Sequence, residues 1–384
     1  MKILFNAFSL VYPISGVGQY TLQLAKALEN LLGQGSVLWF GKKILKDFRG
    51  GSDHQASFLT DPFRYALKNN LRKMPGFTTM VHLWRDRRFQ LYIRQIRPSL
   101  YHETKYAPFH FDCGPTILTI YDLSFVRHPE WHPPDRVKHF EKYCLRKLPQ
   151  VDTIITISEF SRKEIINLLN VRPEKIYVTP LGVDRAFTPG TQQIRELPDR
   201  YILFLGNLEP RKNLPVLVTA YTSLPEKLQE RYPLVIAGAK GWHNHELNKT
   251  LLSLQKKERI IMTGYLPQET LPNLYRRASL FVYPSLYEGF GLPVVEAMAS
   301  GVPVLTSNTT SLPEVVGDAG LLVDPYDVND LREGMLKLLE DEKERNEMSE
   351  KGLERAKLFS WEKCARGTLS VYERTLTGKG RLTQ

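Results

Sequence analysis

The segment from residue 279 to residue 306 limits the fold most strongly, because it contains a strand, a glycine-rich turn, a helix and a second strand in close succession. The apolar run before Pro284 is rich in β-formers and short, as expected of a strand buried in a parallel sheet. Pro293 suits the first helical turn, where its missing N–H costs no hydrogen bond. Gly301 suits the position just after the helix, before the strand Val302–Thr306. The segment therefore predicts one β-α-β unit.

The same alternation of short apolar runs and helical stretches occupies most of the 384 residues. Strands are predicted in the first half at Lys2–Phe8, Leu100–His102, Thr116–Tyr121, Thr153–Ile157 and Ile176–Thr179. In the second half they are predicted at Tyr201–Leu205, Leu234–Ala237, Ile260–Met262, Leu280–Tyr283, Val302–Thr306 and Gly320–Val323. Residues 187–200 are rich in Pro, Gly and polar side chains and are the best candidate for a linker. We expect an α/β protein with two Rossmann-like parallel-sheet domains facing a cleft.

The predicted domains are residues 1–186 and 187–360, followed by a C-terminal helix and tail over 361–384. Ser360 is expected to cap a helix over Trp361–Leu376, and the tail from Gly378 is expected to be disordered.

The composition is that of a soluble globular protein, with 42% hydrophobic and 24% charged residues. We find no run of 18 uncharged apolar residues, and the start MKILFNAF predicts a strand rather than a signal peptide. The three cysteines, Cys113, Cys144 and Cys364, have no zinc-site spacing and suggest no disulfide framework, which suits a reducing cytoplasm.

The formal charge of +11 is concentrated between Arg64 and Arg97, where nine Lys or Arg residues face one acid, Asp86. Apolar side chains alternate with these cations, so the region could lie on an anionic membrane surface at the inner face of the membrane. A solvated basic face that covers the N-terminal core is an equal alternative. Nucleic-acid binding is not expected, because no helix-turn-helix, zinc finger or RNP-like segment is found.

Two carboxylates eight residues apart, Glu288 and Glu296, bracket the glycine-rich turn and the helix start. The backbone N–H groups of Phe290, Gly291 and Leu292 are expected to face the same space, where a helix N-terminus favours an anion. Taken alone, such a pair more often belongs to an ordinary turn whose glutamates are solvated or paired with arginines.

Two further glycine-containing turns follow predicted strands. The first contains Gly16 and Gly18, and by itself it indicates only a tight turn before a helix. The second leads to Arg211 and Lys212, which could bind a diphosphate from the sheet edge or could pair with Glu209 and cap a helix.

The run EGFGLPVVEAMASGVPVLTSNTTSLPEVVGDAGLLVDP, which begins at Glu288, resembles the signature of the family 4 retaining glycosyltransferases. Five more pieces of the resemblance lie in order along the chain: Ile157–Arg162, Pro180–Asp184, Phe204–Asn213, Gly264–Pro267 and Phe359–Trp361. Six ordered pieces that cover most of the chain are far more specific than any one of them.

The resemblance implies a GT-B architecture, with the acceptor in the first domain, the nucleotide sugar in the second and a last helix that crosses back to the first. It implies transfer of a hexose of the glucose or mannose type from a UDP- or GDP-linked sugar to a hydroxyl of a saccharide or polyprenyl-linked acceptor. No cofactor is implied and no metal, and the absence of a D-x-D motif argues against the metal-dependent single-domain transferases.

The resemblance also implies roles for individual residues. The catalytic candidates are Arg211, Lys212, Glu288 and Asp122. The donor-binding candidates are Gly16, Gly18, Gly206, Asn207, Tyr265, Leu266, Phe290, Gly291, Leu292 and Glu296, with Glu296 on the ribose. The family often has His-Asp where this chain has Tyr121-Asp122, so Asp122 is the expected polar contact; Tyr121 and His102 are acceptor-side candidates, and His128 is another outside candidate.

Several alternatives stay open. Same-face attack assisted by the leaving phosphate is preferred to a double displacement with Glu288 as nucleophile, because the spacing of the two glutamates does not ensure the close carboxylate pair that the latter needs. An epimerase or a phosphorylase on the same fold is one rival function. A basic, non-enzymatic protein that binds membranes or polyanions is another. The base, the sugar and the acceptor are not fixed by the sequence.

Overall fold

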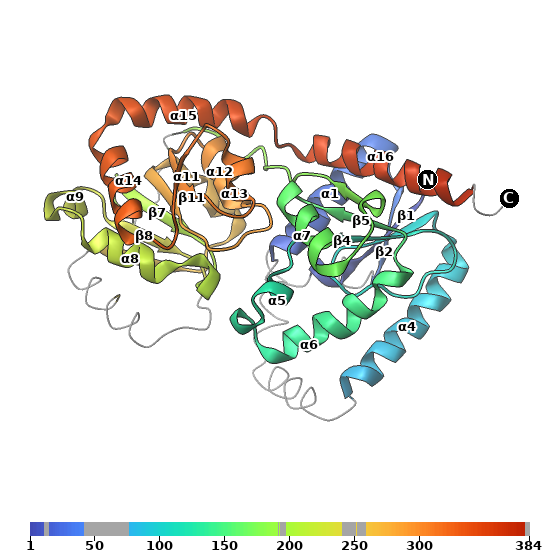
Figure 1. Cartoon of the computed structure of the whole chain (residues 1–384). Helices are drawn as coiled ribbons and strands as arrows, with labels where there is room; N and C mark the ends of the chain where they lie inside the picture. The colour runs from blue at the N-terminus through green and yellow to red at the C-terminus, as the bar shows by residue number, and fades with distance from the viewer. Residues whose placement is uncertain are drawn as a thin grey trace, which may run out of the picture.

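The computed structural model describes residues 1–10, 15–41, 77–190, 192, 197–239, 251 and 259–380. Two lobes lie side by side, and each is built on a six-stranded sheet with helices on both faces (Figure 1). All of the strand pairs within the two sheets are parallel. The α/β fold with two Rossmann-like sheets is therefore confirmed.

The first sheet has the strand order β2-β1-β3-β4-β5-β6. Its strands are β1 (Ile3–Asn6), β2 (Val37–Phe40), β3 (Leu100–Glu103), β4 (Thr116–Ile120), β5 (Thr153–Thr156) and β6 (Ile176–Val178). Its helices are η1 (Ala7–Leu10), α1 (Gly16–Leu32), α4 (Phe77–Ile96), α5 (Ser124–Arg127), η2 (Pro129–Trp131), α6 (Pro134–Tyr143), η3 (Leu145–Gln150), α7 (Glu159–Leu169) and η4 (Pro173–Lys175). The sequence analysis missed β2, a four-residue edge strand whose two middle side chains are only half-buried.

The second sheet has the order β12-β11-β10-β7-β8-β9. Its strands are β7 (Tyr201–Leu205), β8 (Leu234–Ala237), β9 (Ile260–Gly264), β10 (Ala278–Tyr283), β11 (Val304–Ser307) and β12 (Leu321–Val323). Its helices are η5 (Pro210–Lys212), α8 (Leu214–Thr222), α9 (Glu226–Arg231), η6 (Gln268–Thr270), α11 (Leu271–Arg276), α12 (Leu292–Ala299), α13 (Leu312–Val316), α14 (Val328–Glu340) and α15 (Glu342–Ala356). The chain order reverses between β7 and β10, and in open α/β sheets ligands bind at the carboxyl ends of such a strand pair.

Helix α12 ends as the sequence predicts. Gly301 has φ 74°, and its N–H donates to the carbonyl of Met298 at 3.0 Å. The N–H of Val302 donates to the carbonyl of Ala297, also at 3.0 Å. These two bonds form a Schellman motif that satisfies the last carbonyls of the helix. The next strand begins at Val304 rather than Val302 because these residues complete the cap.

Helix α1 begins earlier than predicted. The sequence analysis placed a loop over Ser15–Gly18 and the helix from Gln19, but the helix begins at Gly16. Ser15 is its N-cap, and the hydroxyl of Ser15 accepts a hydrogen bond from the N–H of Gly18 at 3.4 Å. Gly18 therefore lies in the first helical turn, and the prediction of a loop there was wrong.

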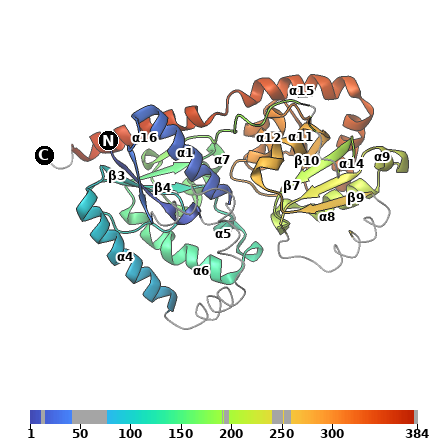
Figure 2. The ribbon, with the colours of Figure 1, turned by 180° about the vertical axis from the view of Figure 1, so that it is seen from behind.

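The last helix, α16 (Trp361–Gly380), crosses from the second lobe to the first and lies against α1 (Figure 2). Its Tyr372 hydroxyl is 2.6 Å from Nδ1 of His102, and its Thr375 hydroxyl is 2.9 Å from that of Thr153. The Ser360 hydroxyl accepts from the N–H of Lys363, which confirms the predicted cap. The helix continues through residues 378–380, so the prediction that disorder begins at Gly378 was wrong. Residues 381–384 lie outside the described residues.

The chain crosses between the lobes twice at nearly the same place. The outgoing segment around Val183 pairs with Ser360 of the returning segment, and the N–H of Val183 donates to Phe359 at 3.3 Å. A Cβ atom added at Gly182 would lie 2.1 Å from the backbone nitrogen of Trp361. The two segments can approach this closely only because residue 182 lacks a side chain.

Within the described part of the chain, no helix combines the length and the apolar character that crossing a bilayer requires.

We predict that Gly182→Ala lowers the midpoint of thermal unfolding by several degrees, because the methyl group would push the two crossing segments apart; overpacking of this kind costs about 1–3 kcal/mol. Gly16→Ala is the matched control, since a Cβ there would meet no atom within 4 Å. Equal midpoints for the two variants, measured by circular dichroism, would contradict this account of the crossing.

Candidate functional site

The loops after β7 and β10 meet at the point where the strand order of the second sheet reverses. Arg211 and Lys212 lie in η5, which follows β7, and Glu288 lies in the loop that follows β10. The carbonyl of Arg211 accepts a hydrogen bond from the N–H of Leu286 at 2.8 Å, so the two loops are joined through their backbones. Where the connections after two neighbouring parallel strands leave in opposite directions, the two loops lie on either side of one crevice.

Glu288 binds both cations. Its Oε2 accepts from the Arg211 guanidinium at 2.7 Å, and its Oε1 accepts from the Lys212 ammonium at 2.5 Å. The hydroxyl of Tyr283 donates to the same Oε1 at 3.0 Å and also contacts the ammonium. Arg211 is held by Glu209 as well, at 3.0 Å. We refer to Arg211, Lys212, Tyr283 and Glu288 as the charged cluster.

The charged cluster is largely buried, with Lys212 at 6% and Glu288 at 7% exposed. Burial alone would raise the pKa of Glu288, but Arg211 and Lys212 lower it to about 2. Burial, together with the charge of Arg211, lowers the pKa of Lys212 despite its contact with Glu288. Burial disfavours the charged form of Arg211, yet Glu288 and Asp122 hold its pKa well above the ordinary value. Two carboxylates, Glu288 and Glu209, therefore lie against the closely spaced basic groups Arg211 and Lys212.

The backbone of Glu288 is clamped by two hydroxyl groups. The N–H of Glu288 donates to Thr310 at 3.2 Å, and the hydroxyl of Ser311 donates to the Glu288 carbonyl at 2.9 Å. Thr310 has φ 59°, a left-handed conformation that is rare for a β-branched residue. Such strain persists where the surrounding structure requires it, and here it brings the Thr310 hydroxyl to Glu288.

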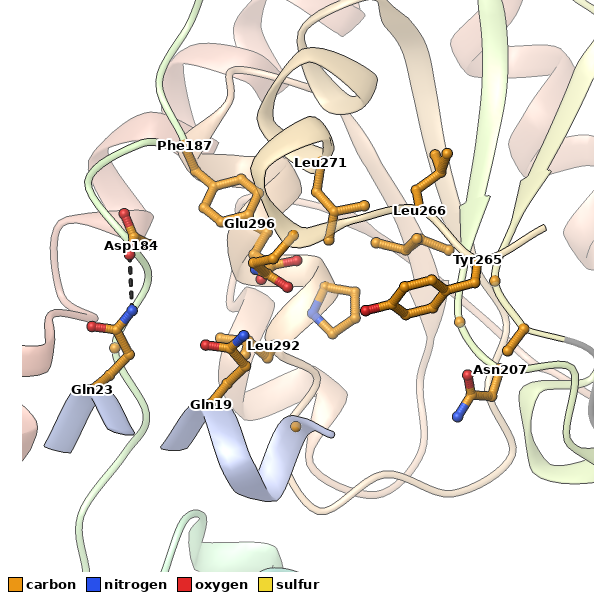
Figure 3. Close-up of a pocket in the computed structure, with 18 of the residues that line it drawn as sticks. Gln19, Gln23, Asp184, Phe187, Asn207, Tyr265, Leu266, Leu271, Leu292 and Glu296 are labelled. Atoms are coloured by element: carbon orange, nitrogen blue, oxygen red, sulfur yellow. Dashed lines mark hydrogen bonds between the residues drawn. The ribbon is translucent and has the colours of Figure 1, made fainter. Parts of the chain in front are cut away.

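A pocket of about 260 Å³ lies beside the charged cluster, between the two lobes. Glu296 on α12 and Tyr265 after β9 line it from the second lobe, opposite Gln19 on α1 (Figure 3). The methylene groups of Lys212 lie next to Gly206, a residue that lines the pocket, so the pocket and the cluster are neighbours. We call this space the cleft pocket.

Glu296 is buried in the wall of the cleft pocket, and its carboxylate accepts a hydrogen bond from Tyr275 at 3.0 Å. Burial raises the pKa of Glu296 to about 8, outweighing the opposite effect of the Tyr275 hydrogen bond. A ligand that donates hydrogen bonds to this group would stabilise its ionised form.

Comparison with known proteins decides the family. Residues 14–187 match the model described as Glycosyltransferase Family 4, and residues 191–355 match the model described as Glycosyl transferases group 1. O-antigen chain mannosyltransferase B of Escherichia coli is 37% identical over 388 residues, covering 97% of this chain and 100% of that protein. The chain belongs to the group 1 glycosyltransferases of family 4. The resemblance inferred from the six sequence pieces is thus confirmed, and the protein is a glycosyltransferase.

The fold of this glycosyltransferase is similar to solved structures of the GT-B class. Sucrose-phosphate synthase from Thermosynechococcus elongatus has a TM-score of 0.71 at 20% identity, covering 98% of this chain and all of that one. HepE from Anabaena, in complex with UDP and glucose, has a TM-score of 0.70 at 18% identity, covering 97% of this chain and 100% of that one. At such identities the likeness shows the fold.

Most of the donor-binding candidates line the cleft pocket of the glycosyltransferase. These are Gly16, Gly206, Asn207, Tyr265, Leu266, Leu292 and Glu296. Gly18 is instead buried within α1, and Phe290 packs on Phe359 with ring centroids 5.5 Å apart. Gly291 is the N-cap of α12 with φ 103°, and a Cβ there would lie 2.6 Å from Leu312.

The catalytic candidate Asp122 and the acceptor-side candidates Tyr121 and His102 lie at different depths of the first sheet. Asp122 is half-buried at the carboxyl end of β4, and its Cβ would be 3.0 Å from a Cβ built on Gly289 of the other lobe. Tyr121 is buried, and its hydroxyl donates to the carbonyl of Thr104 at 2.9 Å. His102 is fully buried in the core rather than in the cleft, and it binds Tyr372 and Thr119 through its two ring nitrogens. Burial lowers the pKa of His102 to about 3, so its place is structural.

Sequence reasoning missed several residues near the cleft. Gln19, Gln23 and Asp184 line the cleft pocket, with the Gln23 amide donating to Asp184 at 3.0 Å (Figure 3). Gln19 and Gln23 are four residues apart on α1, and this spacing could have indicated from the sequence that they share one polar face of the helix. Tyr275 and His132 carry no such signal, because their partners Glu296 and Ser124 are not at a regular helix or strand spacing from them. His128, the outside candidate, is stacked on Trp131 and faces Tyr287.

Across the described residues, no group of three or more His, Cys, Asp or Glu side chains is arranged to hold a metal ion.

Proposed function

We propose that this glycosyltransferase is a retaining hexosyltransferase that moves mannose from a nucleoside diphosphate to a hydroxyl of a saccharide or polyprenyl-linked saccharide. The observation that carries the proposal is the charged cluster beside the cleft pocket, because it offers two fixed cationic groups next to a space of ligand size. Mannose is favoured over glucose because the Escherichia coli relative is named a mannosyltransferase. A nucleotide donor is supported by the complex of HepE, a protein of this fold, with UDP and glucose.

In this proposal the second domain, residues 187–360, binds the donor, and the first, residues 1–186, presents the acceptor. The diphosphate lies between Arg211, Lys212 and the N-terminus of α1 at Gly16. Free N–H groups at a helix N-terminus favour an anion, and Gly16 leaves open space in front of them. The cations take the part that a metal ion plays in other transferases, so neither a metal nor a cofactor is proposed.

We assign the ribose of the donor to Glu296. Vicinal hydroxyl groups can both donate to one carboxylate, and Glu296 faces the cleft pocket from a buried position. Because its pKa is about 8 in the free protein, donor binding at neutral pH is expected to be accompanied by loss of a proton from this group. Tyr265 and Leu266, at the far side of the pocket, are assigned to the base.

Transfer is proposed to occur on one face of the sugar. The bond between C1 and the β-phosphate oxygen breaks, the acceptor oxygen bonds to C1 from the same side, and the acceptor proton passes to the leaving phosphate. A double displacement through Glu288 is disfavoured, because both of its oxygens are engaged and its pKa of about 2 makes it a weak nucleophile. Glu288 instead holds the cations in place, and its Oε2, which accepts from Arg211, has one lone pair left for a sugar hydroxyl.

We predict that two variants change different steady-state parameters with nucleoside diphosphate mannose as the donor. Glu296→Ala is expected to raise the KM for the donor about 10- to 100-fold, the scale of hydrogen bonds to a charged group. Lys212→Ala is expected to lower kcat about 100- to 1,000-fold, because the ammonium stabilises charge that develops on the leaving phosphate.

The matched controls are Lys227→Ala and Glu373→Ala, which remove exposed charges on α9 and α16. Near-normal kinetics for both site variants would contradict the assignment of Glu296 and Lys212 to the donor site. Consumption of the nucleotide sugar without glycoside formation would favour the epimerase or phosphorylase alternative, and no consumption by the wild type would favour the non-enzymatic one.

We also propose that α4 rests on the anionic inner face of the membrane. Its inner side is anchored by Phe89 and Ile93, which are fully buried. Its outward side chains include large apolar residues that are 57–69% exposed, namely Met80, Leu83, Trp84 and Leu91. The guanidinium of Arg88 lies 4.8 Å from the ring of Trp84, so charge and apolar surface are combined. The rest of the basic region, residues 64–76, lies outside the described residues.

The double variant Arg87→Gln, Arg94→Gln is predicted to weaken binding to phosphatidylglycerol vesicles about 30-fold, since each cation near the headgroups contributes about 1 kcal/mol. Co-sedimentation at low and high salt measures this. The matched control is Arg172→Gln, which removes an exposed cation at the N-cap of η4, outside α4. Binding that is absent, or that does not change with salt, would leave the basic face as a solvated surface.

A further inference from the structure

A chain of three polar side chains follows β4 on the face of the first lobe that meets the second. Oδ1 of Asp122 accepts from the hydroxyl of Ser124 at 2.7 Å and from its N–H at 2.9 Å. The same hydroxyl lies 3.0 Å from Nε2 of His132. Ser124 is buried, whereas Asp122 and His132 are half-buried.

The hydrogen bonds that link His132, Ser124 and Asp122 have one consistent order of donors and acceptors. An ionised carboxylate only accepts hydrogen bonds, so the Ser124 hydroxyl donates its single proton to Asp122. The hydroxyl oxygen must then accept from His132, which requires the proton on Nε2. Burial lowers the pKa of His132, so the neutral ring carries that proton on Nε2 and leaves Nδ1 as an acceptor.

The imidazole ring is fixed by aromatic packing. Its centroid lies 4.0 Å from that of Phe125 in a stacked arrangement, and Phe125 is stacked in turn on Phe140 at 5.1 Å. A ring held on one face and hydrogen-bonded at one nitrogen has little freedom to turn. The direction of the Ser124 hydroxyl, and through it that of the Asp122 carboxylate, is therefore set by residues of α5 and α6 and the segment between them.

Asp122 faces the charged cluster. The N–H of its neighbour Leu123 donates to the hydroxyl of Tyr287 at 3.3 Å, and Tyr287 precedes Glu288. The charges of Asp122 and Arg211 interact, as do those of Arg211 and a protonated His132. Within the described part of the chain Asp122 receives hydrogen bonds only at Oδ1, so Oδ2 remains able to accept one.

We propose that Oδ2 of Asp122 binds a hydroxyl of the acceptor saccharide that neighbours the attacking one, whose own proton goes to the leaving phosphate, and that Ser124 and His132 are positioning residues that aim this oxygen. The proposal rests on the transferase function proposed above and adds the acceptor subsite to it. Asp122 orients the acceptor through this neighbouring hydroxyl and is a catalytic residue in the sense that it touches substrate, whereas His132 acts through Ser124. The ligand class is a saccharide with a free hydroxyl next to C1 of the bound donor sugar.

Conservative variants separate positioning from packing. His132→Phe keeps a stacking ring but removes the Nε2 donor, whereas His132→Gln can still donate from a nearby position. Ser124→Ala removes the link between His132 and Asp122. His110→Gln, an exposed histidine away from this chain of contacts, is the control.

The assay uses nucleoside diphosphate mannose as donor and methyl α-D-mannoside as acceptor, with the full-length protein. We expect Ser124→Ala to lower kcat/KM for the acceptor about 10- to 100-fold, the scale of a hydrogen bond to a charged group, and His132→Phe to lower it about 2- to 10-fold, the scale of a bond between neutral groups. The double variant should lose no more than the worse single variant, because both break one chain of contacts. His132→Gln should recover most of the loss, and the dissociation constant for the nucleoside diphosphate should stay unchanged in all of them.

Equal kcat/KM for wild type and His132→Phe would overturn the inference. So would losses that multiply in the double variant, or an equal loss in His132→Gln, since each indicates independent or purely steric effects. Failure of the proposed function looks different: the wild type would then neither bind the nucleoside diphosphate nor consume the nucleotide sugar. An unchanged thermal midpoint and unchanged nucleotide binding show that a variant is folded. If His132→Phe does not fold, Ser124→Ala and His132→Gln still test the inference.

Discussion

The pairing of one buried carboxylate with two cationic groups is the interaction on which the site of this glycosyltransferase depends. Arg211 and Lys212 are adjacent in the chain, and without Glu288 the buried Lys212 would lose its carboxylate partner while Arg211 would keep Glu209. Removing one partner of a buried pair is costly because the remaining charge is left unpaired. Glu288 therefore keeps two cationic groups at the sheet edge in the absence of a ligand. A diphosphate can then bind to groups that are already in position, which avoids the cost of assembling them.

The Glu288 loop is also a place where the two lobes touch. The hydroxyl of Tyr287 donates to Glu164 at 3.1 Å, and Gly289 packs against the backbone of Tyr121 so closely that a side chain would clash. The returning helix α16 is attached to the first lobe through Tyr372 and the buried His102. The segment that carries Glu288 is therefore in direct contact with the first lobe, and a movement of that lobe would displace it. This connection explains why Asp122 of the first lobe lies within electrostatic reach of Arg211.

The fold and the centre of the site were predictable from the sequence because local patterns carry them. Short apolar strands predicted both sheets, and the motif around Glu288 and Glu296 placed both glutamates at the crevice. The strand β2 was missed because four residues at a sheet edge need no long apolar run. His102 was misjudged as an acceptor-side group because sequence cannot tell a buried strand end from an exposed one. His132 was missed because its partners, Ser124 and Phe125, give no pattern until the fold brings them together.

The most direct test of the account is thermal stability of the purified protein in metal-free buffer against UDP, GDP and ADP. A diphosphate at 100 times its dissociation constant adds about 2.7 kcal/mol to the free energy of unfolding. The account predicts that one of the three raises the midpoint selectively and that the corresponding mannose conjugate does so too. It also predicts that the shift is greatly reduced in Glu296→Ala, whose carboxylate lines the cleft pocket. No shift with any diphosphate, or an equal shift in wild type and variant, would contradict it.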